Sequence, residues 1–313
     1  MKLPWRQLMS FETRSFLPAA GGASGLRGPY AKDHVHVRLS PAFNRRQHPD
    51  AGVEAAVDST WTEYLRASPR LFNATKFRLQ DWRPSAGGGL ELQFGLTDYK
   101  TYLGTCCSTA APRLLQDGES GGDRFAFLSR KVGVAAVVET ADAQVALIQR
   151  SKSVGLYQNL RDTPGGHPEP SHIGVTWEVL DALSKDEAQR KEFEIAARDE
   201  FFQSIVNEVH EEINLAPADQ SAPLLLGVVL QTAACTPSFS FYIRTPLSAA
   251  KLHELYRAGP ADKFESQRLD LFDAADLLTQ GSSSSLLDSL QLTPSARGTL
   301  SLWQQYKRSD RHS

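Results

Sequence analysis

A long helical stretch between two pairs of strands constrains the fold of this chain more than any other feature. The stretch covers residues 185–213, and apolar side chains recur at helical spacing toward its C-terminal end. Two aliphatic runs precede it, at residues 132–139 and 144–149, and two more follow it, at residues 224–231 and 239–244. Strands interleaved with long helices predict an α/β or mixed α+β protein.

Shorter elements surround this central pattern. We expect further strands and helices, together with a surface loop rich in Gly and Asp at residues 117–123. The strands are predicted at residues 34–39, 77–79 and 90–96, and the helices at residues 53–65 and 294–306. Thr293 is placed to cap the last of these helices, because Pro294 would occupy its first turn.

Changes in pattern along the chain predict three parts. Residues 1–33 are basic and rich in Ser, Ala and Gly, and we expect a disordered tail or an organellar targeting segment there. A boundary near residues 125–132 separates an N-terminal domain, residues 34–130, from a second domain, residues 131–313.

The charge balance excludes two classes of function. The chain has 313 residues, and 34 Lys plus Arg against 36 Asp plus Glu give a net charge of −2. A nucleic-acid binder that works through a basic face, or a polybasic membrane-surface protein, would carry an excess of positive charge. No apolar run approaches the ~20 residues that span a bilayer. No sequence feature indicates an oligomeric state.

The three cysteines predict a reducing environment. Cys106 and Cys107 are adjacent and Cys235 stands alone, so neither a disulfide framework nor zinc-ligand spacing is present. We therefore expect an intracellular and cytoplasmic protein, unless residues 1–33 direct it to an organelle.

Three carboxylates gather on one side of the long helix. At 100° per residue, Glu208, Glu211 and Glu212 share an arc of about 100°. Such a cluster repels itself unless a cation binds among the carboxylates, and Mg²⁺ prefers a few carboxylates together with water and substrate phosphates. A solvated acidic face is the alternative interpretation.

The segment Thr-Pro-Gly-Gly-His-Pro-Glu-Pro, residues 163–170, lies upstream of these carboxylates. Glycines followed by a proline-fixed loop let the backbone approach a ligand closely. With the acidic helix, this segment resembles the Nudix hydrolase box, in which Gly166 matches the first Gly. An insertion separates the two halves of the box, and Asn214 replaces its last Gly. His172 and Asn207 stand where a paired Glu and Arg are expected.

Further segments are similar to the Nudix subfamily of UDP-glucose pyrophosphatases. They lie at residues 39–46, 71–79, 95–105, 165–170 and 224–228. The resemblance implies a Nudix α/β/α sandwich with a mixed sheet from about residue 131. It also implies that the smaller N-terminal α+β domain contributes to the nucleotide pocket.

The resemblance also implies roles for single residues. Glu208 and Glu212 match the Mg²⁺ ligands, and Glu211 beside them matches a third ligand or a carboxylate that orients water, so all three are candidate catalytic residues. The substrate-binding positions are matched by Phe72, Tyr99, Arg150, Gly155, Asp162, His167 and Glu169. Without the resemblance, Phe72 and Tyr99 would be core aromatics, Arg150 a surface charge, Asp162 a turn residue and His167 a surface histidine.

The activity implied by the resemblance is the Mg²⁺-dependent hydrolysis of UDP-glucose, and of UDP-galactose, to UMP and the hexose 1-phosphate. Two alternatives remain open. One is a Nudix hydrolase of another nucleoside diphosphate derivative, such as ADP-ribose or a dinucleotide. The other is a non-catalytic Nudix-fold binding module, because His172 and Asn207 depart from the box.

Overall fold

The main sheet of the protein is mixed, as the sequence predicts. The computed structural model describes residues 9–18, 25–151, 157–231, 234–261, 266–279 and 286–310. The strands of the main sheet follow the order β1 (Phe11–Ser15), β9 (Leu224–Gln231), β10 (Thr236–Arg244), β5 (Gly133–Glu139), β6 (Gln144–Arg150) and β11 (Ser266–Asp273). Strands β10 and β5 pair in parallel, whereas their neighbours pair antiparallel.

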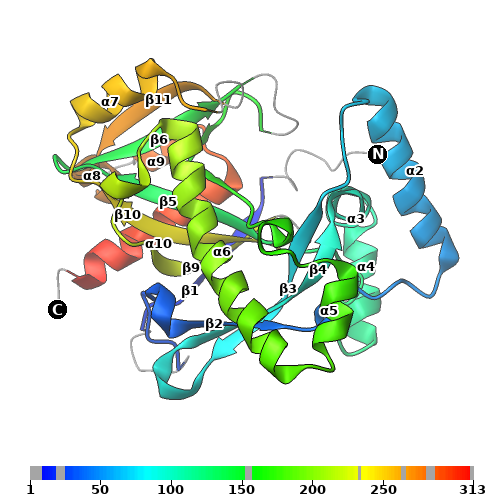
Figure 1. Ribbon diagram of the computed structural model, residues 1–313. Helices are drawn as coiled ribbons and strands as arrows, with labels where there is room; N and C mark the ends of the chain where they lie inside the picture. Colours follow the sequence, from blue (N-terminus) through cyan, green and yellow to red (C-terminus); the bar gives the residue numbers. More distant parts are fainter. Residues whose placement is uncertain are drawn as a thin grey trace.

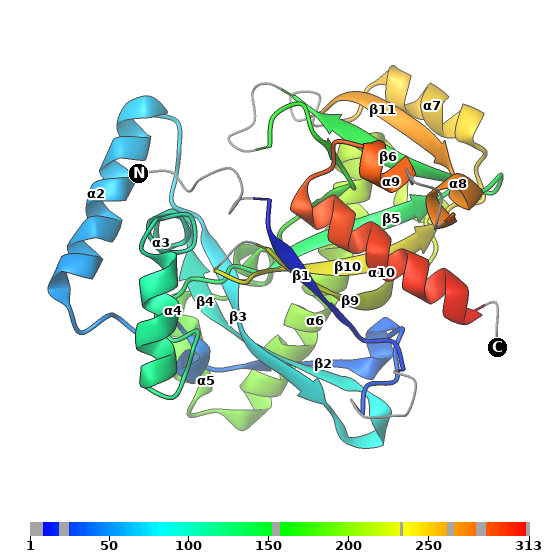
Figure 2. The same cartoon turned by 180° about the vertical axis from the view of Figure 1, so that it is seen from behind.

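One long helix covers each face of this sheet (Figures 1 and 2). Helix α6 (Glu187–Ile213) packs on one face and α10 (Pro294–Asp310) on the other. Successive side chains of a strand point to opposite faces, and β5 is buried on both. Val134 joins the core on the α6 side, whereas Val137 joins the core that contains Trp303 of α10. The predicted α/β/α sandwich is confirmed.

A small sheet in the N-terminal part packs against the same long helix. Its order is β2 (Val35–Leu39), β4 (Leu90–Asp98) and β3 (Thr75–Pro84), with β2 parallel and β3 antiparallel to β4. The Phe201 ring of α6 lies 5.8 Å from Phe94 of the small sheet and 5.1 Å from Phe239 of the main sheet. The two sheets therefore share one hydrophobic core through α6.

Helix α2 (Ala51–Ala67) runs along the outside of the small sheet, beside α3 (Tyr99–Thr105) (Figure 1). The two helices approach closely at Gly104, where an added Cβ would lie 2.8 Å from Cα of Val57. The short helix α3 therefore has α2 on one side and the strands on the other.

Two predictions about irregular segments are wrong. Residues 117–120 belong to helix α4 (Ala111–Ser120) and not to a loop; Gly118 lies buried there, and a Cβ on it would meet the backbone oxygens of the following turn. Within the expected tail, β1 pairs with β9 along its whole length, so residues 11–15 are part of the main sheet.

Most of the predicted helices and strands occur in the structure, and several further elements were not predicted. The long helix begins two residues later than predicted, at Glu187, and the hydroxyl of Thr293 accepts a hydrogen bond from the backbone N–H of Ala296, as expected of a cap. The unexpected elements include α5 (Trp177–Leu183), α7 (Ala249–Ala258), β11, α8 (Ala274–Leu278) and α9 (Leu286–Ser289). In the described part of the chain, every helix is too short or too polar to cross a membrane.

Candidate active site

The Gly-Gly segment forms a short strand beside the long helix. Strand β8 (Gly165–Gly166) pairs antiparallel with β5, where Val134 faces Gly166. A Cβ on Gly166 would overlap the carboxylate of Glu208, and a Cβ on Gly165 would overlap the carbonyl oxygen of Val134. Glycine is therefore required at both positions for the strand to fit between β5 and α6.

Two carboxylates of α6 accept hydrogen bonds from this segment. The backbone N–H of Gly165 donates to Oε2 of Glu212 (2.8 Å), and the N–H of His167 donates to Oε1 of Glu208 (3.3 Å). The two donors are two residues apart in extended chain, which spans about 6.6 Å, and the two acceptors are four residues apart in a helix, which rises about 6 Å. The spacing of the donors therefore matches the spacing of the carboxylates. Glu212 is 3% exposed, so the interpretation of a solvated acidic face is wrong for this residue.

A third carboxylate, Glu200, was not identified from the sequence. It is 7% exposed and accepts a hydrogen bond from the N–H of Glu169 (2.9 Å). Nδ1 of His172 lies 3.1 Å from the same carboxylate oxygen, whereas Asn207 bonds with Gln203 on its own helix. His172 and Asn207 therefore do not pair as the Glu and Arg of the box would: the long insertion brings His172 to Glu200, about two helical turns before Asn207.

A pocket of about 280 Å³ brings four predicted residues together. Tyr99 is the first residue of α3, Arg150 the last of β6, Asp162 the last of β7 (Arg161–Asp162), and His167 follows β8. Both glycines of β8 line the same pocket. The pocket therefore contains residues from the N-terminal part and from the main sheet, next to the carboxylates of α6.

Arg150 and Asp162 form an ion pair in the wall of the pocket. Nη1 of Arg150 lies 3.2 Å from Oδ2 of Asp162, and the Thr293 hydroxyl donates to Oδ1 (2.7 Å). Burial raises the pKa of Asp162, although Arg150 and the hydrogen bonds partly oppose this shift. Nε of Arg150 is buried and has no acceptor among the described residues.

The sequence did not identify Lys131, which also lines the pocket. Its side chain contacts Nε2 of His167, and its ammonium lies 4.5 Å from the centre of the Tyr102 ring. Burial lowers the pKa of Lys131 to about 8, and burial together with the nearby lysines lowers the pKa of His167 well below its usual value. His167 is therefore neutral, and its Nε2 accepts the hydrogen bond from Lys131.

Polar and aromatic side chains complete the pocket. Tyr102 lies one helical turn after Tyr99, a spacing that places both rings on one face and is visible in the sequence. Hydroxyl groups gather at the other wall, around the N-terminus of α10, where Ser238 and Ser295 are hydrogen-bonded to each other at 3.0 Å. The sequence does not predict this group of hydroxyls, because only the packing of β10 against α10 brings Ser238 and Ser295 together.

Two other predicted substrate-binding residues, Phe72 and Glu169, do not line this pocket. Phe72 is 76% exposed, so it is not a core aromatic; its segment adjoins Tyr99, whose N–H donates to the carbonyl of Ala74 (3.1 Å). Glu169 forms an ion pair with Lys76. Gly155 lies outside the described residues.

The carboxylates of α6 provide part of a binding site for a divalent cation. Glu208 and Glu212 project from α6 toward the same short strand, which suits an ion held by two carboxylates, water and substrate phosphates. Among the described residues, no cluster of three or more metal-binding side chains occurs. Glu211 is exposed and forms no hydrogen bond or ion pair in that part of the chain, so its role stays a prediction.

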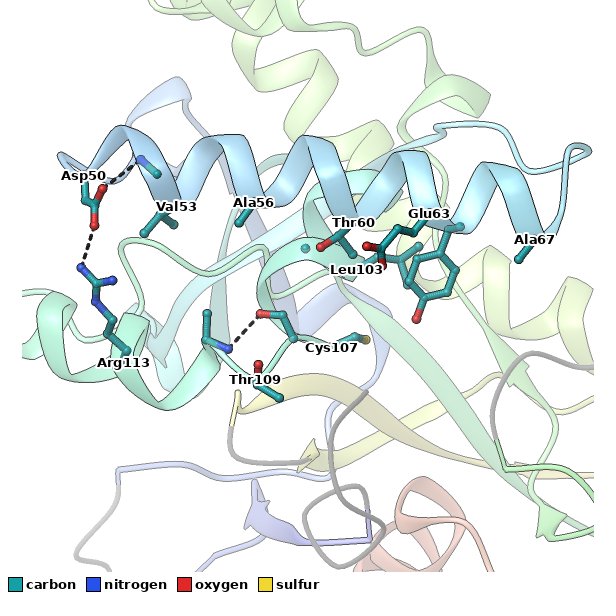
Figure 3. A pocket seen from close by; sticks show the side chains of 15 residues that line it. Asp50, Val53, Ala56, Thr60, Glu63, Ala67, Leu103, Cys107, Thr109 and Arg113 are labelled. Atoms are coloured by element: carbon teal, nitrogen blue, oxygen red, sulfur yellow. Dashed lines mark hydrogen bonds and ion pairs between the residues drawn. The ribbon is translucent and has the colours of Figure 1, made fainter. Parts of the chain in front are cut away.

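A larger pocket of about 750 Å³ lies between α2 and the segment that joins α3 to α4 (Figure 3). Figure 3 shows the ion pair of Arg113 with Asp50 (2.9 Å) at one end and Glu63 toward the other. None of the predicted site residues lines it among the described residues. The smaller pocket is therefore the candidate active site.

Curated proteins similar to this chain cover nearly its whole length. Uridine diphosphate glucose pyrophosphatase NUDT22 from Bos taurus is 32% identical over 290 residues, which are 90% of this chain and 95% of the relative. The protein of the same name from Homo sapiens is 32% identical over 291 residues, 90% of this chain and 91% of the relative. Nudix hydrolase 9 from Arabidopsis thaliana is 30% identical over 75% of this chain and 76% of its own.

Solved structures similar to this chain are more distant. The MutT protein from Methanosarcina mazei Go1 is 13% identical, with a TM-score of 0.34 over 57% of this chain and 94% of its own. A NUDIX hydrolase from Nitrosomonas europaea is 16% identical, with a TM-score of 0.32 over 56% and 89%. No family model matches the sequence.

Proposed function

The chain belongs to the Nudix hydrolase family, and we propose that it hydrolyses UDP-glucose and UDP-galactose to UMP and the hexose 1-phosphate in a Mg²⁺-dependent reaction. The names of two relatives support UDP-glucose as the substrate, because both are called uridine diphosphate glucose pyrophosphatases.

One observation carries the proposal: a single pocket combines aromatic rings, cationic groups and hydroxyl groups beside the carboxylates of α6. Tyr99 and Tyr102 offer flat surfaces on which a base can stack. Asp162 and the hydroxyls near Ser295 provide partners for sugar hydroxyls. These features match the base and the sugar of a nucleoside diphosphate sugar.

The residues have distinct tasks in the proposed reaction. Glu208 and Glu212 would hold the cation, which when bound neutralises diphosphate charge and lowers the pKa of a bound water. Arg150, which lines the pocket and is oriented by Asp162, offers its guanidinium to a phosphate oxygen and stabilises the charge that develops when the bond to phosphorus breaks. The glycines of β8 let the diphosphate approach the backbone closely.

A coupled phosphatase assay tests the proposal. The purified full chain is incubated with Mg²⁺, alkaline phosphatase and one substrate at a time: UDP-glucose, UDP-galactose, ADP-ribose or a dinucleoside polyphosphate. Alkaline phosphatase releases phosphate from UMP and hexose 1-phosphate but not from an intact UDP-sugar. We expect phosphate release from the two UDP-sugars. The metal requirement is tested without the phosphatase, which EDTA would itself inactivate: UMP formation, followed by chromatography, should be lost in EDTA.

The other outcomes contradict the proposal in different ways. Release from ADP-ribose or the dinucleotide with no release from either UDP-sugar would indicate a different Nudix substrate. Binding of UDP-glucose without any turnover, measured by calorimetry, would indicate a binding module. Undiminished turnover in EDTA would contradict the metal requirement.

A further inference from the structure

Lys131 is a buried cation without a compensating anion. Its residue is 8% exposed, and no carboxylate of the described residues lies within ion-pair distance of its ammonium. A buried charge is normally paired, because transfer from water to the protein interior is unfavourable for an isolated ion. Lys131 therefore lacks the partner that buried lysines usually have.

Lys307 shows the usual arrangement in the same protein. Its ammonium lies 5.5 Å from the centre of the Tyr242 ring, much as Lys131 lies over Tyr102. In contrast to Lys131, Lys307 is 3.1 Å from both carboxylate oxygens of Glu139. The two lysines differ in the presence of the carboxylate.

The groups around Lys131 do not replace this anion. His167 and Tyr102 are neutral, and burial raises the pKa of the Cys107 thiol to about 12, so this group is also uncharged at neutral pH. The nearby Lys76 is a cation, and it already pairs with Glu169. Among the described groups, the environment of Lys131 thus offers a hydrogen bond and a ring face, and the one nearby carboxylate that favours the charged lysine, Glu169, is the smallest of the effects on its pKa and already pairs with Lys76.

The ammonium is next to the place where a ligand would carry its charge. Lys131 lines the pocket together with Tyr99 at one side and the β8 glycines at the other. The same pocket holds the buried Nε of Arg150, which has no acceptor among the described residues. The ammonium of Lys131, which has no carboxylate partner, and the guanidinium of Arg150, which pairs with Asp162, therefore belong to the wall of one cavity between the aromatic rings and the Gly-Gly strand.

We propose that Lys131 binds a phosphate group of the nucleotide and is a substrate-binding residue of this enzyme. This proposal rests on the proposed function, because it takes the ligand to be a nucleoside diphosphate. The ammonium of Lys131 donates to a phosphate oxygen while His167 accepts one of its other N–H bonds. The ring of Tyr102 fixes its position.

Calorimetric titration of two ligands isolates the phosphate contact. UMP and uridine are titrated in Mg²⁺ buffer into the full-length wild type and into Lys131→Met, Lys131→Arg and Lys307→Met. A hydrogen bond to a charged group contributes roughly 1.5–3 kcal/mol, so we expect Lys131→Met to bind UMP about 10- to 150-fold more weakly. Uridine affinity should stay within about twofold. Lys131→Arg should recover part of the UMP affinity, and Lys307→Met should bind both ligands as the wild type does.

The remaining outcomes overturn the proposal or separate it from the proposed function. Unchanged UMP affinity in Lys131→Met, or an equal loss for UMP and uridine, would mean that Lys131 makes no phosphate contact. If either of these two results is found and the wild type hydrolyses UDP-glucose, the proposed function stands and only the assignment of Lys131 fails. If no UDP-sugar is hydrolysed but UMP binding depends on Lys131 as expected, the phosphate contact stands and the proposed function fails.

Discussion

Replacing Lys131 with Met should stabilise the ligand-free protein, although the same change is expected to weaken nucleotide binding. Burial lowers the pKa of Lys131 from 10.5 to about 8, with smaller opposing effects from Cys107, Cys106 and Glu169 and a reinforcing effect from Lys76. At 1.36 kcal/mol per pKa unit, this shift corresponds to about 3 kcal/mol of destabilisation when the lysine is charged. The contact with the Tyr102 ring offsets about 1 kcal/mol of it, so Met should raise the free energy of unfolding at pH 7 by about 2 kcal/mol.

The pH dependence provides the decisive test. The folded-state pKa lies below the unfolded-state value, so between about pH 8 and 10.5 the unfolded chain binds more protons at Lys131 and the stability of the wild type rises with pH. Urea denaturation of both proteins at pH 7, 8.5 and 10 should show a difference that shrinks toward zero as the pH rises.

Lys307→Met is the matched control, because it removes a lysine that does have a carboxylate partner. Its loss leaves Glu139, which is 6% exposed, without a cation, and we expect destabilisation at pH 7. If Lys131→Met were instead destabilised like Lys307→Met, or if its gain persisted at pH 10, the interpretation of Lys131 as an uncompensated buried cation would be wrong.

Three further changes test other parts of the site. Glu212→Gln should abolish turnover of UDP-glucose with little change in fold, whereas the exposed Glu211→Gln should retain more activity; equal rates in a saturating-Mg²⁺ assay would contradict the metal assignment. Phe72→Ala should raise the KM for UDP-glucose by roughly 5- to 150-fold through the loss of one base stack, with an unchanged Tm because the ring is exposed; a wild-type KM would exclude the stack. Asp162→Ala should lower stability by about 1–3 kcal/mol in urea denaturation, because Arg150 and a hydroxyl lose their partner; no loss of stability would show that the ion pair is not important.

The local sequence pattern was sufficient to predict most strands and helices of the sandwich. The aliphatic runs at β5, β6 and β9 and the long periodic helix were predicted, because alternation and helical spacing depend on neighbouring residues only. Helix α4 was not predicted, and its end was assigned to a loop because Gly118 and its neighbours favour a loop locally, whereas a buried contact with the following turn selects Gly within a helix. Strand β1 was missed because only its pairing with β9 defines it.

The residues of the candidate site also divide into those that the sequence predicts and those that only the fold reveals. Residues in the Gly-Gly motif and in short matching segments were identified from the sequence, and Tyr99, Arg150, Asp162 and His167 meet in one pocket. Lys131 was missed because its position before a buried strand resembles any solvated lysine. The partner of His172 was missed because the insertion breaks the spacing of the box, and only the folded helix brings Glu200 to it.

Strand β1 also has a consequence for which edge of the main sheet is open to pairing with another chain. It covers the hydrogen-bonding edge of β9, whose sequence Leu-Leu-Leu-Gly-Val-Val-Leu-Gln has high β-propensity and no charge. The side chains of Glu12 and Arg14 point to solvent from β1, and such charges discourage another chain from adding to the sheet. Deleting residues 1–16 as an apparent tail would uncover β9, and light scattering should then detect aggregation that the full chain resists.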